Sequence, residues 1–368
     1  MKAVWLTGHG GLDKLQYTEN APVPEIADDE VRIRVHACGL NNTDINTRTG
    51  WYSKGVEQGI TEAAVQDGYG SADNADGSWR NHVITFPRIQ GADVCGIVDS
   101  VASARHRGLI GRRVMIDPWF LDRNHPSDRT RARYFGSETD GGYAEYTIAP
   151  AGNVYPLESA YSDAEIATFA CAYGTAENLI ECTGLGDNET VIVSGASGGV
   201  GSATIQLAKI RNARVIALSG PGKERALLDI GADHVVSRHE PDVEKRIREI
   251  AGAGIDVAVD VVGGEIFTLL INCLRPGGRY SSSGCIAGPM VQFDLRKLVY
   301  RDLQLTGATV IPAGTFGKLV HYIEAEKLKP LLAGTWPLKD LAKAQQCFMK
   351  KTHVGNLVIT MDRTGAHP

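Results

Sequence analysis

Between Thr190 and Thr309 the chain alternates two hydrophobic patterns. Short runs rich in β-branched residues, which predict strands, read TVIVSGA, ARVIALS, HVVS, IDVAVDVV, GGRYSSSG and LQLTGAT. The first four segments between them repeat apolar residues every three or four positions, as amphipathic helices do. Strands that alternate with helices build a parallel sheet covered on both faces. We therefore expect the α/β class, with a doubly wound domain in this region.

The first 150 residues show a different pattern, with alternating runs such as EVRIRVHAC and GYAEYTIAP between turn signals. They predict a mainly β domain. After Thr309, a helix around 315–326, the amphipathic KDLAKAQQCFMKK and the strand NLVIT are expected to pack back onto it. The predicted divisions are 1–157, the β-rich domain; 158–309, the doubly wound domain; and 310–368, the returning segment.

Composition excludes several classes of protein. The 368 residues are 43% hydrophobic and 22% charged, which is typical of a globular protein, and the net charge of -5 gives no reason to expect nucleic acid. The seven cysteines form no CxxC pair, which argues against a disulfide framework. The first residues show no apolar stretch of signal-peptide length, and the one long charge-free run is broken by SGASGGVGS. We expect a cytoplasmic protein without a membrane partner.

The strongest local motif is VIVSGASGGVGSATIQLAK, in which a strand, a glycine turn and an amphipathic helix follow one another. Read as A-x-G-x-x-G, it is a dinucleotide-binding fingerprint, because small residues let a pyrophosphate approach the N–H groups at the helix start. A glycine turn that only packs the helix on the sheet is the alternative. We assign the following residues of the turn to cofactor binding: Ala196, Ser197, Gly198, Gly199, Val200 and Gly201.

The end of the second strand indicates which dinucleotide binds. An acidic residue there would bind the ribose hydroxyls of NAD, but the strand ends in Ser219, and the following turn supplies Lys223 and Arg225. Cationic side chains suit a 2'-phosphate. NADPH is therefore expected, with NADH less favoured. The alternative is that Lys223 and Arg225 are ordinary solvated helix residues.

Several motifs together make the sequence similar to the medium-chain dehydrogenase/reductase superfamily, and within it to the zinc-independent quinone oxidoreductase branch. They are ACGLNNTDINTRTGWY, FPRIQGADVCGIV, GGYAEY, TFACAYGTA, GASGGVG, DVVGG, LRPGGRYSSSG and HVGNLVI. The resemblance covers nearly the whole chain. It implies a Rossmann domain beside a GroES-like catalytic domain, and NADPH-dependent hydride transfer to a quinone or α,β-unsaturated carbonyl. It also implies a homodimer joined through the edge strand LQLTGAT.

Two other functions stay open at this point. One is an alcohol or aldehyde dehydrogenase of the same superfamily. The other is a relative without enzymatic activity that keeps the cofactor site.

The resemblance also implies where zinc ligands would fall. Relatives that bind catalytic zinc use a cysteine, a histidine and a cysteine, and the matching positions here are Asn41, Ala92 and Cys171. One thiol, an amide and a methyl group cannot hold zinc tightly. The lobe in which relatives place structural-zinc cysteines matches 117–142, which contains none. We expect no zinc at either site.

Candidate reacting groups follow from the same comparison. Asn41 and Tyr52 match residues near the substrate and are expected to polarise it or deliver a proton, and Thr43 matches a proton-relay hydroxyl. Asp44 completes the NxxD motif but could equally brace a turn, and Tyr52 could be a rim aromatic. Further contacts to the nicotinamide and its ribose are implied for Thr175, Val262, Gly263, Ser283 and Gly284.

Two departures from the family pattern affect substrate choice. About 30 extra residues lie within 53–88, directly after the GWY motif, where Trp51, Tyr69 and Trp79 are candidates for an aromatic lid. An insertion with no role in the site is the alternative. Asn356 stands where relatives often carry lysine, which weakens any transfer of substrate specificity.

Overall fold

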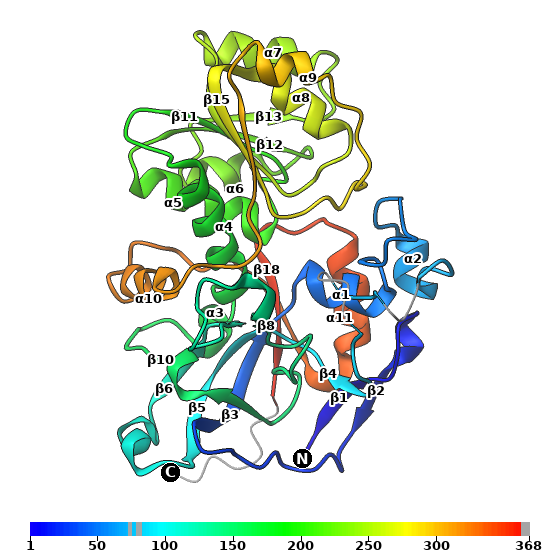
Figure 1. Cartoon of the computed structure of the whole chain (residues 1–368), viewed down its shortest axis with the longest axis vertical. Helices are drawn as coiled ribbons and strands as arrows, with labels where there is room; N and C mark the ends of the chain where they lie inside the picture. Colours follow the sequence, from blue (N-terminus) through cyan, green and yellow to red (C-terminus); the bar gives the residue numbers. More distant parts are fainter. Residues whose placement is uncertain (73–75, 79–82, 362–368) are drawn as a thin grey trace.

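The computed structural model describes residues 1–72, 76–78 and 83–361. One half, at the top of Figure 1, is built on a parallel sheet with helices around it. Its strands lie in the order β13-β12-β11-β14-β15-β16. This is the order of a doubly wound dinucleotide-binding fold, so the predicted α/β class is confirmed. The strands are β11 Thr190–Val193, β12 Arg214–Ser219, β13 His234–Ser237, β14 Ile255–Asp260, β15 Leu274–Ser282 and β16 Gln304–Gly307.

Helices cover both faces of this sheet, and neighbouring side chains of one strand enter different cores. Val191 and Val193 of β11 pack with α4 and α5, whereas Ile192 packs with α7 and α8. Successive side chains of a strand point to opposite faces, so a continuously apolar strand is required here. The helices are α4 Ala170–Thr183, α5 Gly199–Ile210, α6 Glu224–Asp229, α7 Val243–Ala251, α8 Glu265–Cys273 and α9 Leu295–Val299.

The other half contains a second sheet, in the order β10-β6-β5-β3-β18-β17, with β9 also paired to β3. Strand β18 runs antiparallel to β3, with Val358 opposite Gly39. The returning segment therefore adds strands to the sheet that contains β3 of the N-terminal region. The strands are β3 Glu30–Gly39, β5 Asp93–Val101, β6 Arg113–Ile116, β9 Tyr146–Pro150, β10 Val154–Pro156, β17 Leu332–Pro337 and β18 Asn356–Thr360.

Smaller elements surround these sheets. Strands β2-β1-β4 form one small sheet and β7-β8 another. Their bounds are β1 Ala3–Leu6, β2 Leu15–Thr18, β4 Arg88–Ile89, β7 Trp119–Phe120 and β8 Arg133–Tyr134. The remaining helices are α1 Asn42–Thr49, α2 Glu62–Asp67, α3 Asp163–Ile166, α10 Thr315–Glu324 and α11 Leu341–Met349, with 3-10 turns η1 Leu12–Lys14, η2 Ala104–Leu109, η3 Arg129–Arg131, η4 Ala151–Asn153 and η5 Leu338–Asp340. Within the described ranges, no helix is both long and apolar enough to cross a bilayer.

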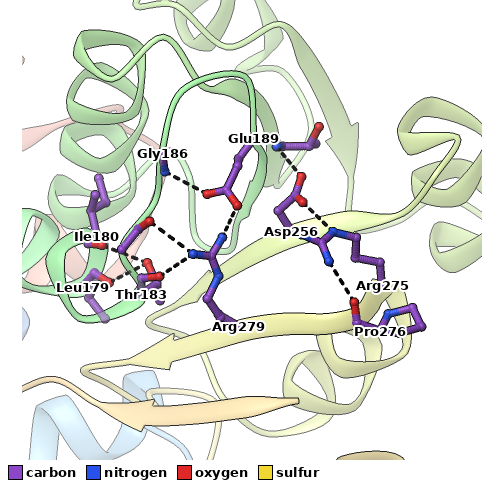
Figure 2. A network of polar contacts seen from close by, with 11 residues as sticks. Leu179, Ile180, Thr183, Gly186, Glu189, Asp256, Arg275, Pro276 and Arg279 are labelled. Atoms are coloured by element: carbon purple, nitrogen blue, oxygen red, sulfur yellow. Dashed lines mark hydrogen bonds and ion pairs between the residues drawn. The ribbon is translucent and has the colours of Figure 1, made fainter. Parts of the chain in front are cut away.

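A polar network fixes the end of α4 to the parallel sheet, as Figure 2 shows. Arg279 of β15 donates to the carbonyl of Thr183 at 2.8 Å and pairs with the carboxylate of Glu189. Glu189 also accepts a hydrogen bond from the backbone N–H of Gly186 at 2.8 Å. Charge-assisted bonds of this kind are the stronger class of hydrogen bond. The network therefore helps to hold α4 in place on the sheet.

Candidate functional site

The glycine turn lies between β11 and α5, at the carboxyl end of the strand where the order of the sheet reverses between β11 and β14. Open α/β sheets bind ligands at such a switch point. A Cβ at Gly201 would lie 2.3 Å from the Gly195 carbonyl oxygen, so only glycine fits there. Gly195 has a φ of 56°, in the left-handed region that glycine tolerates. The turn therefore has the narrow backbone that a dinucleotide pyrophosphate needs.

Two lysines meet beside this turn. Lys223 Nζ donates to Ser197 Oγ at 3.1 Å and to the Lys351 carbonyl at 2.6 Å, and Lys351 Nζ donates to Asn42 Oδ1 at 2.9 Å. Burial, with a contribution from Lys223, lowers the pKa of Lys351 to about 7. The same two causes, burial and the lysines, lower the pKa of His353 to about 4. Among the residues that the structure describes, no carboxylate is paired with either lysine, so the two lysines favour an anionic ligand.

Lys351 was not among the predicted site residues. It comes from the returning segment, where the only sequence signal is the KK pair of FMKKTHVG. Gly355 in the same segment donates its N–H to the Ser197 carbonyl at 3.0 Å, which brings that segment against the glycine turn. Asn356 is packed just as closely, since a Cβ at Gly199 would lie 2.4 Å from its Oδ1 atom.

The structure separates the other residues predicted to select the cofactor. Ser219 is buried at the end of β12 and donates its hydroxyl to the Gly220 carbonyl at 3.0 Å. Arg225 is 88% exposed and pairs with Asp229 one helical turn further on, so it does not join Lys223. Arg238, which sequence reasoning missed, donates its backbone N–H to the Ser219 carbonyl at 2.8 Å. A Cβ on Gly220 would lie 4.0 Å from its guanidinium, so Arg238 is the arginine at this strand end.

The turn after β14 is organised by one buried carboxylate. Asp260 accepts the backbone N–H groups of Val262 at 2.8 Å and Gly263 at 3.2 Å. The Ser283 N–H donates to the Asp260 carbonyl at 3.3 Å. Gly284 follows directly, and its N–H donates to Ser282 Oγ at 3.4 Å. The structure thus brings together four of the five residues predicted to contact the nicotinamide and its ribose; the fifth, Thr175, lies in α4.

A second buried carboxylate joins the two halves of the molecule. Asp93, on β5, accepts Nδ2–H of Asn41 at 3.0 Å and the backbone N–H of Cys171 at 2.6 Å. Asn41 precedes α1, and Cys171 lies in the first turn of α4, where Thr175 also hydrogen-bonds its thiol. Burial raises the pKa of Asp93 to about 7, even though both hydrogen bonds oppose that shift. The Asn41 amide is therefore held by Asp93, which gives it a positioning role.

Asp44 braces the start of α1. Its Oδ2 atom accepts the Asn41 N–H at 2.8 Å and the Tyr143 hydroxyl at 2.9 Å. Burial raises the pKa of Asp44 to about 6, again against its hydrogen bonds. Of the two roles considered for Asp44, the structure supports bracing.

Hydroxyl groups lie nearby on two different segments. Tyr52 donates to Thr43 Oγ1 at 3.2 Å, and burial raises the pKa of Tyr52 to about 12. Tyr134, on β8, donates to Cys171 Sγ at 3.1 Å, and burial raises its pKa well above the usual value. Both phenols therefore stay protonated at neutral pH and can donate. Tyr134 was missed because nothing in the local sequence shows that β8 approaches α4.

The three positions that match zinc ligands carry an amide, a methyl group and a thiol. The Asn41 amide is bonded to Asp93, and Ala92 offers only a methyl group. Burial, reinforced by Asp93, raises the pKa of the Cys171 thiol well above its usual value, so this thiol is protonated in the metal-free protein. Among the residues that the structure describes, no three His, Cys, Asp or Glu side chains are grouped so as to hold a metal.

Two of the three aromatic residues predicted to form a lid belong to a small hydrophobic core. Trp51 and Tyr69 are buried with Val56 and Ala64 in this core, against which Tyr52 and Cys285 pack. Trp79 lies outside the described residues.

A sheet of this order, a glycine turn at its switch point and a second domain whose returning segment contacts that turn define a two-domain dinucleotide-binding oxidoreductase fold. Comparison with known proteins agrees, since the profile of the alcohol dehydrogenase GroES-like domain matches 27–159 and that of the zinc-binding dehydrogenase family matches 199–325. The chain belongs to the medium-chain dehydrogenase/reductase superfamily, in its quinone oxidoreductase-like branch. The predicted family and its fold are therefore confirmed.

Three relatives illustrate this membership. A crystal structure from Sinorhizobium meliloti 1021, provisionally named an alcohol dehydrogenase, is 46% identical with a TM-score of 0.89, and the match covers 98% of this chain and 97% of that one. Quinone oxidoreductase of Mus musculus is 26% identical over 94% of this chain and 93% of its own length. The synaptic vesicle membrane protein VAT-1 homolog-like of Mus musculus is 26% identical over 99% of this chain and 82% of its own length.

The raised pKa of Asp93 predicts a pH-dependent stability. Between about pH 4 and 7 the folded protein holds a proton on Asp93 that the unfolded chain has lost, so this group's contribution to stability falls as pH rises. Asp93→Asn removes that contribution. From pH 5 to pH 8, the unfolding free energy of the variant relative to the parent should rise by at least about 1.4 kcal/mol, the equivalent of one pKa unit.

Urea unfolding at both pH values measures this difference, and Asp28→Asn, at an exposed position, is the control. A relative stability of Asp93→Asn that does not change with pH would contradict the assignment.

Proposed function

We propose that this protein is an NADPH-dependent reductase of quinones or α,β-unsaturated carbonyls that works without a metal ion. The observation that carries the proposal is the chemistry at the three zinc-ligand positions, an amide held by Asp93, a methyl group and a protonated thiol. In the absence of a metal ion, hydrogen-bond donors would stabilise the charge that develops on the substrate's carbonyl oxygen. Conjugated carbonyls suit such a site, because their electrophilic carbon is activated without a Lewis acid.

The cationic groups beside the glycine turn support NADPH as the cofactor. Lys223 donates to Ser197 Oγ and to the Lys351 carbonyl, and Arg238 lies at the end of β12, where an acidic residue would favour NADH. Their chemistry suits phosphate groups.

Within this proposal, reduced nicotinamide supplies a hydride to the substrate. The residues of the chain orient the substrate and supply the proton. Tyr52 has a protonated phenol that donates to Thr43 Oγ1. When Tyr52 gives its proton to the substrate, the Thr43 hydroxyl can pass a proton to Tyr52 and take up one from solvent in return. Tyr134 offers a second phenolic donor beside Cys171. Asn41, Asp44 and Asp93 hold the segment that carries Thr43 in place.

An alcohol dehydrogenase activity is the second candidate, because the Sinorhizobium meliloti relative carries that provisional name. Metal analysis separates the two functions. One zinc per chain, with activity that is lost to chelators, would favour the alcohol dehydrogenase.

We also propose a cytoplasmic homodimer. Strand β16 is the edge of the parallel sheet, and exposed apolar side chains gather along α9 and the adjoining segments: Met290, Val291, Leu295, Val299, Tyr300 and Leu305. Unpaired edges and apolar patches of this kind are typical of interfaces between copies. A monomeric mass in solution light scattering would contradict the dimer.

Replacing Lys351 should test the cofactor. We expect Lys351→Met to weaken NADPH binding by about tenfold, the loss of one charge-assisted contact, and to leave NADH binding nearly unchanged. Its neighbour Lys350 is exposed, so Lys350→Met is a matched control. Nicotinamide fluorescence titrations measure both affinities, and equal losses for NADPH and NADH would contradict the phosphate role.

The same site predicts a pH dependence. The pKa of Lys351 in the free protein is about 7, with Lys223 and His353 as its charged and titratable neighbours, so above pH 7 binding of the phosphate must be accompanied by proton uptake. NADPH affinity should therefore fall as pH rises from 7 to 9, and Lys351→Met should lose this dependence.

Removing the Tyr52 hydroxyl should slow catalysis without affecting the cofactor. We expect Tyr52→Phe to lower kcat by about 100-fold, the lower end for general acid catalysis, while NADPH affinity stays the same. The ring itself packs edge-on against Trp51 and is kept in the variant. Turnover of an enone in water and in deuterium oxide measures the effect, and a Tyr52→Phe enzyme with the parent's rate and solvent isotope effect would contradict the proton-donor role.

A further inference from the structure

Within the described part of the insertion, two aromatic side chains hold the segment 58–60, which we call its tip. Trp51 Nε1 donates to the Gln58 carbonyl at 3.0 Å, and the Tyr69 hydroxyl donates to the Gly59 carbonyl at 2.8 Å. Both rings are buried, with exposed fractions of 7% and 8%. The tip, 58–60, is thus fixed by two side chains that lie on either side of it in the sequence.

This tip contacts the doubly wound domain directly. The Ile60 N–H donates to the Ile286 carbonyl at 2.8 Å. Gly59 lies so close that a Cβ there would be 2.7 Å from the carbonyl carbon and oxygen of Ala287. No side chain fits between the two backbones, so glycine at position 59 is a requirement of space.

The turn that receives the tip is itself bonded to the candidate cofactor site. The Ala287 N–H donates to the Val262 carbonyl at 2.8 Å, and the Gly264 N–H donates to the Gly288 carbonyl at 3.2 Å. A Cβ at Gly263 would lie 2.7 Å from Cys285 Cβ. Ser283 and Gly284 immediately precede this turn in the chain. A shift of 285–288 would therefore move both segments expected to border the nicotinamide.

We propose that 58–60 and 285–288 form an interdomain clasp that positions the nicotinamide-bordering segments and slows release of the cofactor. Gly59 and Ile60 are positioning residues in this scheme, because they act on the cofactor through 285–288. The inference rests on the proposed cofactor site and adds to it a function for the insertion. Domains joined by modest interfaces move relative to one another, and release of product or cofactor often limits turnover.

Two alanine substitutions within the insertion test the clasp. Gly59→Ala places a methyl group against the Ala287 backbone. Gly70→Ala is the matched control, because Gly70 is exposed and no atom of the described residues lies within 4 Å of a Cβ there. Tyr69→Phe is a milder second variant, which removes only the hydroxyl that holds the Gly59 carbonyl. Thermal unfolding checks that each variant is folded.

The first measurement is the rate at which NADPH leaves each protein, followed by stopped-flow displacement. We expect release about fivefold faster from Gly59→Ala, as for the loss of one backbone hydrogen bond, with Tyr69→Phe intermediate and Gly70→Ala unchanged. The second measurement is amide hydrogen exchange of the peptides covering 56–65 and 283–290 in the cofactor-free protein. Relative to the parent protein, both peptides should exchange faster in Gly59→Ala and at an unchanged rate in Gly70→Ala.

The outcomes separate the clasp from the proposed function. Equal exchange in Gly59→Ala and Gly70→Ala would overturn the clasp, and faster exchange with an unchanged release rate would overturn its role in holding the cofactor. If the parent protein binds no NADPH, the proposed cofactor is wrong, and the exchange measurement still decides whether the two segments are joined.

Discussion

The buried carboxylate of Asp93 is the constraint on which the candidate site depends. It accepts one hydrogen bond from Asn41 before α1 and one from Cys171 in α4, so one side chain of β5 fixes the start of both helices. A buried charge is costly unless it is hydrogen-bonded, and the raised pKa of Asp93 reflects that cost. The positions of Thr43 and Tyr134 relative to each other follow from this junction, because each lies beside one of the two segments that Asp93 joins.

Three further contacts between the two halves of the molecule lie beside the candidate cofactor site. The returning segment reaches the glycine turn through Gly355, and Lys351 from that segment meets Lys223 of the doubly wound domain. The insertion reaches the same domain from another side, through Ile60. A cofactor in the proposed site would therefore be surrounded by groups from the N-terminal domain, the doubly wound domain and the returning segment. Binding and catalysis should be coupled through these contacts.

Sequence patterns predicted those helices and strands whose hydrophobic pattern reflects which of their faces are buried in the fold. The strands of the parallel sheet are continuously apolar because both faces are buried. The glycine turn is recognisable because its tight backbone requires small residues at fixed positions. Helix α4 was not predicted, since its buried residues include the polar Glu177 and Asn178, and Gly174 lies within it where a Cβ would meet Ile311. Strand β17 was missed because LAGTWP contains glycine and proline and acquires its pairing only from β18.

The residues of the candidate site likewise fall into those that could be predicted from the sequence and those that could not. Those in a contiguous motif, such as the turn around Gly198, were found from the sequence. Tyr134, Lys351 and Arg238 were not, because they reach the site through contacts between segments far apart in the chain. Arg225 was predicted beside Lys223, but the start of α6 turns it outward to Asp229.

The most direct test of the account is transfer of deuterium from NADPH labelled at C4 to an enone, using protein shown by metal analysis to contain no zinc. The account predicts label on the β-carbon of the reduced product, at a rate unaffected by chelators. Failure of the metal-free protein to transfer the label, with activity restored by one zinc per chain, would contradict it.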